Sequence, residues 1–200
     1  KTFHPSRRSG LLRSELGLED KFVFLHVGRL AAEKGIPRLL DAFQIARQEL
    51  PPGRAHLVIA GGGPEEQRLR ASAPKDVTFL GVPDRATALP QLYASADAFI
   101  FSSITETLGL VVLEAMASGL PVIAIPAGGV ADHLRDNENG IACAPDDVTG
   151  MARARLTRGV DAPRRNRLAA GARRTTDALG WEAELYLLVA SYREVIQSAT

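Results

Sequence analysis

Two acidic and two basic side chains give this sequence most of its chemical potential. Glu106 and Glu114 have seven residues between them, and Arg29 and Lys34 lie in a separate segment. Guanidinium and ammonium groups bind phosphate, whereas carboxylates accept hydrogen bonds from hydroxyl groups. The four residues therefore predict one pocket for a ligand that carries both phosphate and hydroxyl groups.

The basic pair stands in a turn that is bounded by glycines. Gly28 precedes Arg29, and Gly35 follows Lys34 at the start of a helical pattern. Helix N-termini attract anions, and the two cations add full charges. An ordinary surface loop with a solvated arginine and lysine is an equally good interpretation of this turn taken alone.

A second glycine-rich turn is Gly61-Gly62-Gly63-Pro64. Glycines let the backbone approach a ligand closely, and proline suits the first position of a helix. The segment matches neither the dinucleotide-binding fingerprint nor the phosphate-binding loop of nucleotide hydrolases. A tight turn between a strand and a helix is as good an interpretation as a ligand contact.

The segment between the two glutamates predicts the opening of a helix. Gly109 and Leu110 would begin this helix and leave backbone N–H groups free for a phosphate. Glu114 then lies in the apolar run 111–116, where a carboxylate is costly to bury unless it is paired or hydrogen-bonded. The alternative is an exposed or purely structural glutamate.

The elements that would position these residues are short apolar runs that alternate with amphipathic segments. This alternation predicts an α/β fold, a doubly wound Rossmann-like parallel sheet of about six strands with helices on both faces, closed by C-terminal helices. The expected strands are 22–27, 57–60, 77–80, 98–101, 122–125 and 141–143, and the expected helices are 35–50, 65–72, 86–96, 110–118 and 130–134. Ligands bind beyond the carboxyl ends of the strands in such sheets, which is where the candidate residues fall.

The composition is that of an ordinary globular protein. Hydrophobic residues make up 46% of the 200 residues and the formal net charge is +1, so nucleic acid is not the expected partner. The single cysteine, Cys143, is expected to be a small buried hydrophobe, and it fits a reducing cytoplasm. No apolar run approaches the roughly 20 residues that span a membrane.

We expect one domain over residues 1–200, with a linker and a first helix over 1–20, an α/β core over 21–147 and C-terminal helices over 148–200. The sequence begins without methionine, which is expected of a piece of a longer protein. The arginines at positions 164, 165, 167, 173 and 174 are expected on a solvated helix face. Contact with a missing domain or a membrane surface is the alternative, and peripheral membrane association of the parent goes with it.

Four motifs, in this order, resemble the group 1 family of retaining GT-B glycosyltransferases. They are Gly28-Arg29-Leu30 with Glu33-Lys34-Gly35, the Gly61–Pro64 turn, Phe79-Leu80-Gly81, and the segment from Glu106 to Glu114 followed by Ala117-Ser118-Gly119-Leu120-Pro121-Val122. The resemblance extends from Phe3, near the end of an interdomain linker, to residues 181–192, a closing helix. The sequence around Glu106 is similar to the sulfoquinovosyltransferase-like and mannosyltransferase-like branches.

The resemblance implies a role for each candidate residue. Arg29 and Lys34 would bind the diphosphate of a nucleotide-sugar donor and stabilise the leaving nucleoside diphosphate. Glu106 would bind hydroxyls of the donor sugar, and Glu114 would bind the ribose hydroxyls. Further donor contacts would come from Gly28, from Gly61, Gly62 and Gly63, from Val82 near the base, and from Gly109 and Leu110 at the β-phosphate.

The resemblance also implies that this chain is the donor-binding half of a cytoplasmic transferase. The N-terminal acceptor domain, with the catalytic histidine of the family, would be absent, so the chain alone is expected to be inactive. The parent would move a hexose from a UDP- or GDP-linked donor to an acceptor hydroxyl, with no metal and no cofactor. The four histidines of this chain match no family position and are interpreted as structural or surface residues: His4, His26, His56 and His133.

Two other classes of protein are alternatives. A dinucleotide or flavin domain predicts a G-x-G-x-x-G motif after the first strand, and Gly28-Arg29-Leu30 lacks it. A regulatory nucleotide-binding module without transferase activity would keep the fold but not a functional arrangement of the motif residues.

Overall fold

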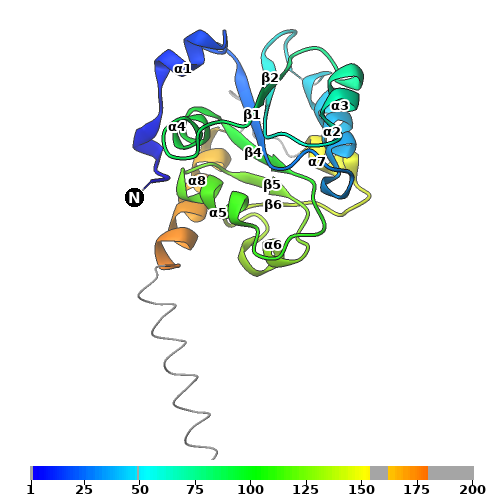
Figure 1. Cartoon of the computed structure of the whole chain (residues 1–200). Helices are drawn as coiled ribbons and strands as arrows, with labels where there is room; N and C mark the ends of the chain where they lie inside the picture. The colour runs from blue at the N-terminus through cyan, green and yellow to red at the C-terminus, as the bar shows by residue number, and fades with distance from the viewer. Residues whose placement is uncertain (1, 49, 154–161, 180–200) are drawn as a thin grey trace, which may run out of the picture.

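The structure, a computed structural model that describes residues 2–48, 50–153 and 162–179, is built on one sheet of six parallel strands (Figure 1). The strand order is β3-β2-β1-β4-β5-β6, so the predicted doubly wound fold is confirmed. The strands are β1 (Phe22–Val27), β2 (Ala55–Ala60), β3 (Val77–Gly81), β4 (Ala98–Phe101), β5 (Val122–Ala124) and β6 (Gly140–Ala142).

Because both faces of the sheet are buried, the strands appear in the sequence as continuous apolar runs. Every residue of β1 is buried, as expected for a central strand of a parallel sheet. β2 begins two residues before the predicted start because Ala55 pairs with Phe22 of β1. Pairing with β1 thus sets the start of β2, which the apolar run alone does not identify.

Helices cover both faces of the sheet. On one face lie α2 (Ile36–Gln48), α3 (Glu66–Ser72) and α7 (Val148–Arg153), and on the other lie α4 (Ala88–Ser95) and α5 (Leu110–Ala117) (Figure 1). The long helix α8 (Ala162–Ala178) packs against α5 and β6. The remaining helices are α1 (Gly10–Glu15), α6 (Gly129–His133) and the 3-10 turns Pro5–Arg7 and Ala32–Lys34.

The strand order changes direction between β1 and β4, and this change positions the candidate site. The chain runs outward from β1 to β3 and then returns to place β4 on the other side of β1. The segments that follow β1 and β4 therefore diverge to opposite faces and leave a crevice at the carboxyl edge. The hydroxyl of Ser102, directly after β4, donates to the carbonyls of Lys34 and Gly35 at 3.1 and 2.9 Å and ties the two segments together.

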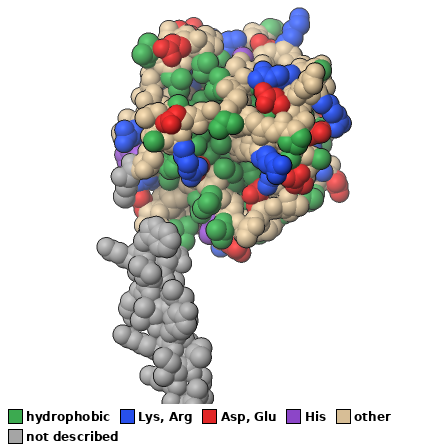
Figure 2. Space-filling model, in the orientation of Figure 1, with side chains coloured by type: hydrophobic (Ala, Val, Ile, Leu, Met, Phe, Trp, Pro, Cys, Tyr) green, Lys and Arg blue, Asp and Glu red, His purple; other side chains and the backbone are tan. Residues whose placement is uncertain are grey.

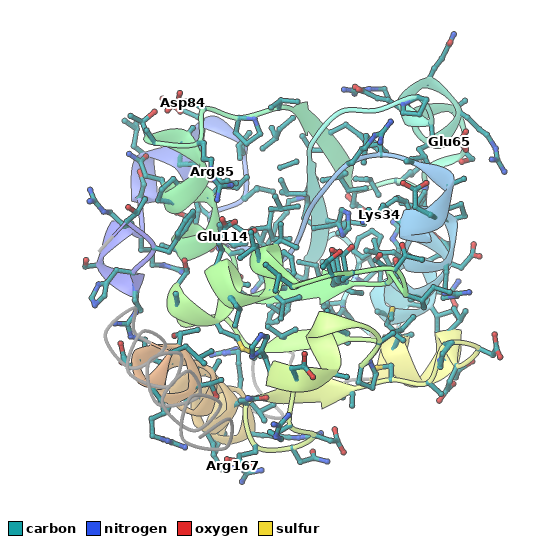
Figure 3. The ribbon with its side chains drawn as sticks, turned by 60° about the horizontal axis from the view of Figure 1, so that its bottom comes forward. Lys34, Glu65, Asp84, Arg85, Glu114 and Arg167 are labelled. Atoms are coloured by element: carbon teal, nitrogen blue, oxygen red, sulfur yellow. The ribbon has the colours of Figure 1, made fainter. Side chains whose placement is uncertain are left out.

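The predicted solvated face of α8 is confirmed for Arg167 and Arg174, which are exposed, but not for every arginine of the helix. The Arg173 side chain donates to the carbonyl of Ala117 and pairs with Asp177, and Arg164 donates to Asn137. Packing of α8 against α5 brings Arg173 to the last carbonyls of that helix, which lack intrahelical donors. Arg167 is exposed, as predicted, and projects from α8 away from the sheet (Figure 3). The predicted closing helix at 181–192 lies outside the described residues.

The expectation that Cys143 is a buried hydrophobe is confirmed. Cys143 is buried, and burial raises the pKa of its thiol to about 11, so it is an unreactive hydrophobe. On the face in Figure 2, acidic and basic side chains are interspersed and no patch of one sign stands out. Within the described ranges, no helix is long and apolar enough to cross a membrane.

Candidate functional site

A cavity of about 340 Å³ lies at the carboxyl edge of the sheet, where the segments after β1 and β4 meet. We call it the central cavity. It is lined by His26, Gly28, Arg29, Glu33, Lys34, Phe101, Glu106 and Val111. Three of the four residues that the sequence predicts for one pocket, namely Arg29, Lys34 and Glu106, thus share this cavity.

The strongest interaction in the central cavity is an ion pair between the two segments. The Nζ atom of Lys34 lies 2.6 Å from Oε1 of Glu106, and the two side chains are 20% and 16% exposed. A charge-assisted hydrogen bond of this length in a partly desolvated place holds both groups firmly. Arg29 is exposed at the rim and is free to turn toward a ligand.

A second cavity of about 300 Å³ adjoins the first and covers the start of α5. We call it the helix-cap cavity. It shares Lys34, Glu106 and Val111 with the central cavity and adds the loop 105–110. Gly109 is the N-cap of α5 with a φ of 65°, and no side chain caps the helix. The first amides of α5 therefore face the same space as the Lys34 ammonium, which is the arrangement that binds phosphate at a helix N-terminus.

The loop that carries Glu106 is held from behind by the turn after β5. The amide of Gly129 donates to the carbonyl of Glu106 at 2.9 Å. Gly128 has a φ of 54°, and a Cβ atom there would lie 2.0 Å from the same carbonyl oxygen. Backbone packs directly on backbone, so these glycines fix the position of Glu106 and leave no room for a larger residue.

The Gly61–Gly63 turn has a structural explanation as well. A Cβ atom on Gly61 would lie 1.8 Å from the carbonyl oxygen of Gly28, and one on Gly63 would lie 2.3 Å from that of Leu30. The turn thus packs against the loop that holds Arg29. Gly62 lies next to Val82, which is 80% exposed, and neither residue lines the central cavity or the loop 105–110 beside it.

Glu114 lies apart from the two cavities. Its side chain is 9% exposed; one carboxylate oxygen pairs with Arg85, and the other accepts a hydrogen bond from the Tyr93 hydroxyl at 3.1 Å. Burial raises the pKa of Tyr93 well above its ordinary value, and the Glu114 charge raises it further, so the hydroxyl stays protonated and donates. Figure 3 shows Arg85 and Glu114 together, with Lys34 across the site from them.

The bonds from these two partners offset the cost of burying the Glu114 carboxylate, which the sequence analysis identified from its apolar neighbours. Sequence reasoning missed its partners, Arg85 and Tyr93, because they belong to the segment before α4 and to α4 itself. The only available signal was an arginine three residues after Val82, which was predicted to lie near the base. The Arg85 side chain is 69% exposed and that of Glu114 is 9% exposed, so Arg85 is the solvent-facing partner of this pair.

No cluster of histidine, cysteine and carboxylate side chains suited to a metal ion occurs in the described part of the chain. The positive charges at the site come from side chains and helix amides. The candidate residues therefore offer two cations, free amides and a carboxylate around adjoining cavities. Such a set can bind a diphosphate and a polyhydroxyl group side by side.

Comparison with known proteins gives this site a context. The family model described as "Glycosyl transferases group 1" matches residues 21–157. A sulfoquinovosyl transferase of Arabidopsis thaliana is 35% identical over 193 residues, which cover 91% of this chain and 36% of that protein. A GDP-mannose-dependent alpha-mannosyltransferase of Mycobacterium tuberculosis is 35% identical over 201 residues, which cover 96% of this chain and 48% of that protein.

Solved structures agree with the sequence relatives. The Anabaena protein HepE, solved in complex with UDP-glucose, matches with a TM-score of 0.75 and 26% identity over 98% of this chain and 56% of its own. The chain spans about half, or less, of the length of these relatives.

Proposed function

This chain belongs to the group 1 glycosyl transferase family, and on that premise we propose that it is the donor-binding domain of a hexosyltransferase. The parent enzyme moves a hexose from a nucleoside-diphosphate sugar to an acceptor hydroxyl. The observation that carries the proposal is the 2.6 Å pair of Lys34 and Glu106, which lies between two adjoining cavities at the switch point of the sheet. We expect UDP or GDP as the nucleotide, because HepE was solved with UDP-glucose and the mannosyltransferase uses GDP-mannose.

In this proposal the diphosphate lies over the start of α5. Lys34 and Arg29 supply positive charge, and the first amides of α5, from Leu110 onward, donate hydrogen bonds. Glu106 keeps its bond to Lys34 and presents its second oxygen to hydroxyls of the sugar. The ribose reaches Glu114 when Arg85 moves aside, and the base lies near Val82.

The same groups favour cleavage of the donor. As the bond between the anomeric carbon and the phosphate oxygen breaks, negative charge grows on the departing nucleoside diphosphate. Lys34, Arg29 and the helix amides already surround that position, so they stabilise the transition state more than the ground state. The acceptor oxygen forms the new bond to the anomeric carbon and its hydroxyl proton is released. We propose retention of configuration from the family resemblance, and that neither metal nor cofactor takes part.

The rest of the active site belongs to the parent protein in this proposal. The acceptor and the catalytic histidine of the family would be supplied by an N-terminal domain outside this chain. A cytoplasmic parent with a peripheral contact to the membrane is compatible with the proposal. The isolated chain should bind donors but transfer no sugar.

A thermal-shift experiment with the isolated chain tests the proposal. Any ligand that binds only the folded chain raises the apparent melting temperature. We expect UDP or GDP at millimolar concentration to raise it, and NAD and FMN to leave it unchanged. Stabilisation by NAD or FMN alone would assign the domain to dinucleotide or flavin chemistry, and no shift with any nucleotide would favour a domain that kept only the fold.

A further inference from the structure

One polar atom of the central cavity has no hydrogen-bond partner. His26 is the fifth residue of β1 and is fully buried. Its Nδ1 atom lies 3.2 Å from the carbonyl oxygen of Ile100 on β4. Because a carbonyl only accepts, Nδ1 carries the proton and Nε2 carries a lone pair. Nε2 has no partner among the described residues, and an unsatisfied acceptor of this kind is rare in a folded protein.

The ring is held so that Nε2 lies beside Gly28, which also lines the central cavity. The imidazole stacks on Phe101 with 5.6 Å between ring centroids and 18° between planes. Gly28 lies two residues further along the chain, directly after β1, and a Cβ atom there would lie 3.4 Å from Nε2. Glycine leaves this approach open, and both residues line the central cavity.

The ring is neutral, which limits what it can bind. The pKa of His26 is lowered to about 4, chiefly by burial; the Ile100 carbonyl and Glu106 oppose the shift, and Lys34 contributes to it. At neutral pH, Nε2 therefore accepts a hydrogen bond and cannot donate one. Phosphate oxygens are acceptors as well, so a diphosphate does not complement this atom. A hydroxyl group does.

The position of His26 favours a hydroxyl of the donor sugar, and not one of the ribose, as the group that would bind Nε2. Glu106, which is proposed to bind the sugar, lines the same cavity as His26, whereas Glu114, proposed for the ribose, does not. Lys34 is bonded to Glu106, and no side chain of the described residues donates to Nε2 in this structure.

We propose that Nε2 of His26 accepts a hydrogen bond from a hydroxyl of the donor sugar, which makes His26 a specificity-determining residue beside Glu106. This inference rests on the proposed function and deepens it. It predicts that the domain favours sugars with a hydroxyl at the contacted carbon over the corresponding deoxy sugars.

Calorimetric titration with four ligands tests the proposal: UDP-glucose, GDP-mannose, UDP and GDP. The variant His26→Phe removes the acceptor and keeps a flat ring to stack on Phe101. We expect it to weaken the preferred nucleotide sugar about tenfold and the matching nucleoside diphosphate less than about twofold. The variant His26→Gln, which restores an oxygen acceptor, should recover part of the loss.

A matched control comes from β2. His56 is a partly buried strand histidine whose Nδ1 likewise has no partner among the described residues, but its Nε2 bonds to Thr78 at 2.8 Å and it does not line the central cavity. His56→Phe should leave the ratio of the two affinities unchanged. Nitrogen NMR of the unmodified chain gives a second readout that needs no variant, because the Nε2 resonance should move with the nucleotide sugar and stay in place with the nucleoside diphosphate.

The outcomes separate this inference from the proposed function. If the unmodified chain binds none of the four ligands, both fail. If it binds them and His26→Phe weakens nucleotide sugar and nucleoside diphosphate equally, the donor site stands and the role of His26 is refuted. An Nε2 resonance that shifts equally with both ligands would refute it in the same way.

Discussion

Replacing Lys34 by methionine tests the electrostatics of the site most sharply. Methionine keeps an unbranched apolar stem, one atom shorter than lysine, and removes the ammonium that pairs with Glu106 at 2.6 Å. A hydrogen bond to a charged group contributes about 1.5–3 kcal/mol. Glu106, only 16% exposed, would then face the diphosphate without a counter-charge, so we expect a loss at the upper end, about 3 kcal/mol or roughly 100-fold in affinity for UDP or GDP.

A double variant separates the lost bond between Lys34 and the phosphate from the repulsion that the uncompensated Glu106 carboxylate adds. Lys34→Met combined with Glu106→Gln also removes the uncompensated carboxylate, so the loss should shrink to about tenfold. Isothermal titration with the nucleoside diphosphate measures each variant, and Lys75→Met, at an exposed lysine before β3, is the control for loss of a positive charge. An affinity that Lys34→Met lowers by less than about threefold would refute the phosphate role of Lys34.

Three further predictions concern other parts of the site. Glu114→Gln should weaken binding of the nucleoside diphosphate more than binding of pyrophosphate, which has no ribose; equal losses in titrations would count against the ribose contact. Gly128→Ala should destabilise the domain by at least about 2 kcal/mol in urea unfolding, since its Cβ atom would meet the Glu106 carbonyl at 2.0 Å and the φ is positive; an unchanged midpoint would contradict this packing. The pKa of His26 falls from 6.5 in its ordinary state to about 4 on folding. The unfolded chain therefore binds the proton first as the pH drops through that window, and stability should decline by up to about 3 kcal/mol toward its lower end. In urea unfolding over that range, His26→Phe should lack this part of the decline, and an identical pH dependence in the variant would show that His26 is not the group responsible.

The fold was predictable because its elements carry separate signals. The buried run 22–27 and the helix that opens at Gly109 appear where the sequence placed them. Strand ends were less predictable, as at Ala55, because pairing with a neighbour decides them. The approximate place of the site followed from the rule that ligands bind at the carboxyl edge of a parallel sheet.

The side-chain partners were not predictable in the same way. Glu114 was expected to share a pocket with Lys34, but the α5 surface that carries it faces α4, where Arg85 and Tyr93 hold it. Periodicity identifies the buried side of a helix but not which neighbour covers each residue. His26 did leave a signal, because a histidine interrupts an otherwise apolar strand two residues before a glycine. It was interpreted as structural, and its unpartnered Nε2 is visible only in three dimensions.

A crystal structure of this chain with UDP-glucose or GDP-mannose bound would test the central claim most directly. The account predicts phosphate oxygens within hydrogen-bonding distance of Lys34 and of the first amides of α5, with the sugar at Glu106. A nucleotide bound at another edge of the sheet, with the pair of Lys34 and Glu106 left without a ligand contact, would contradict it.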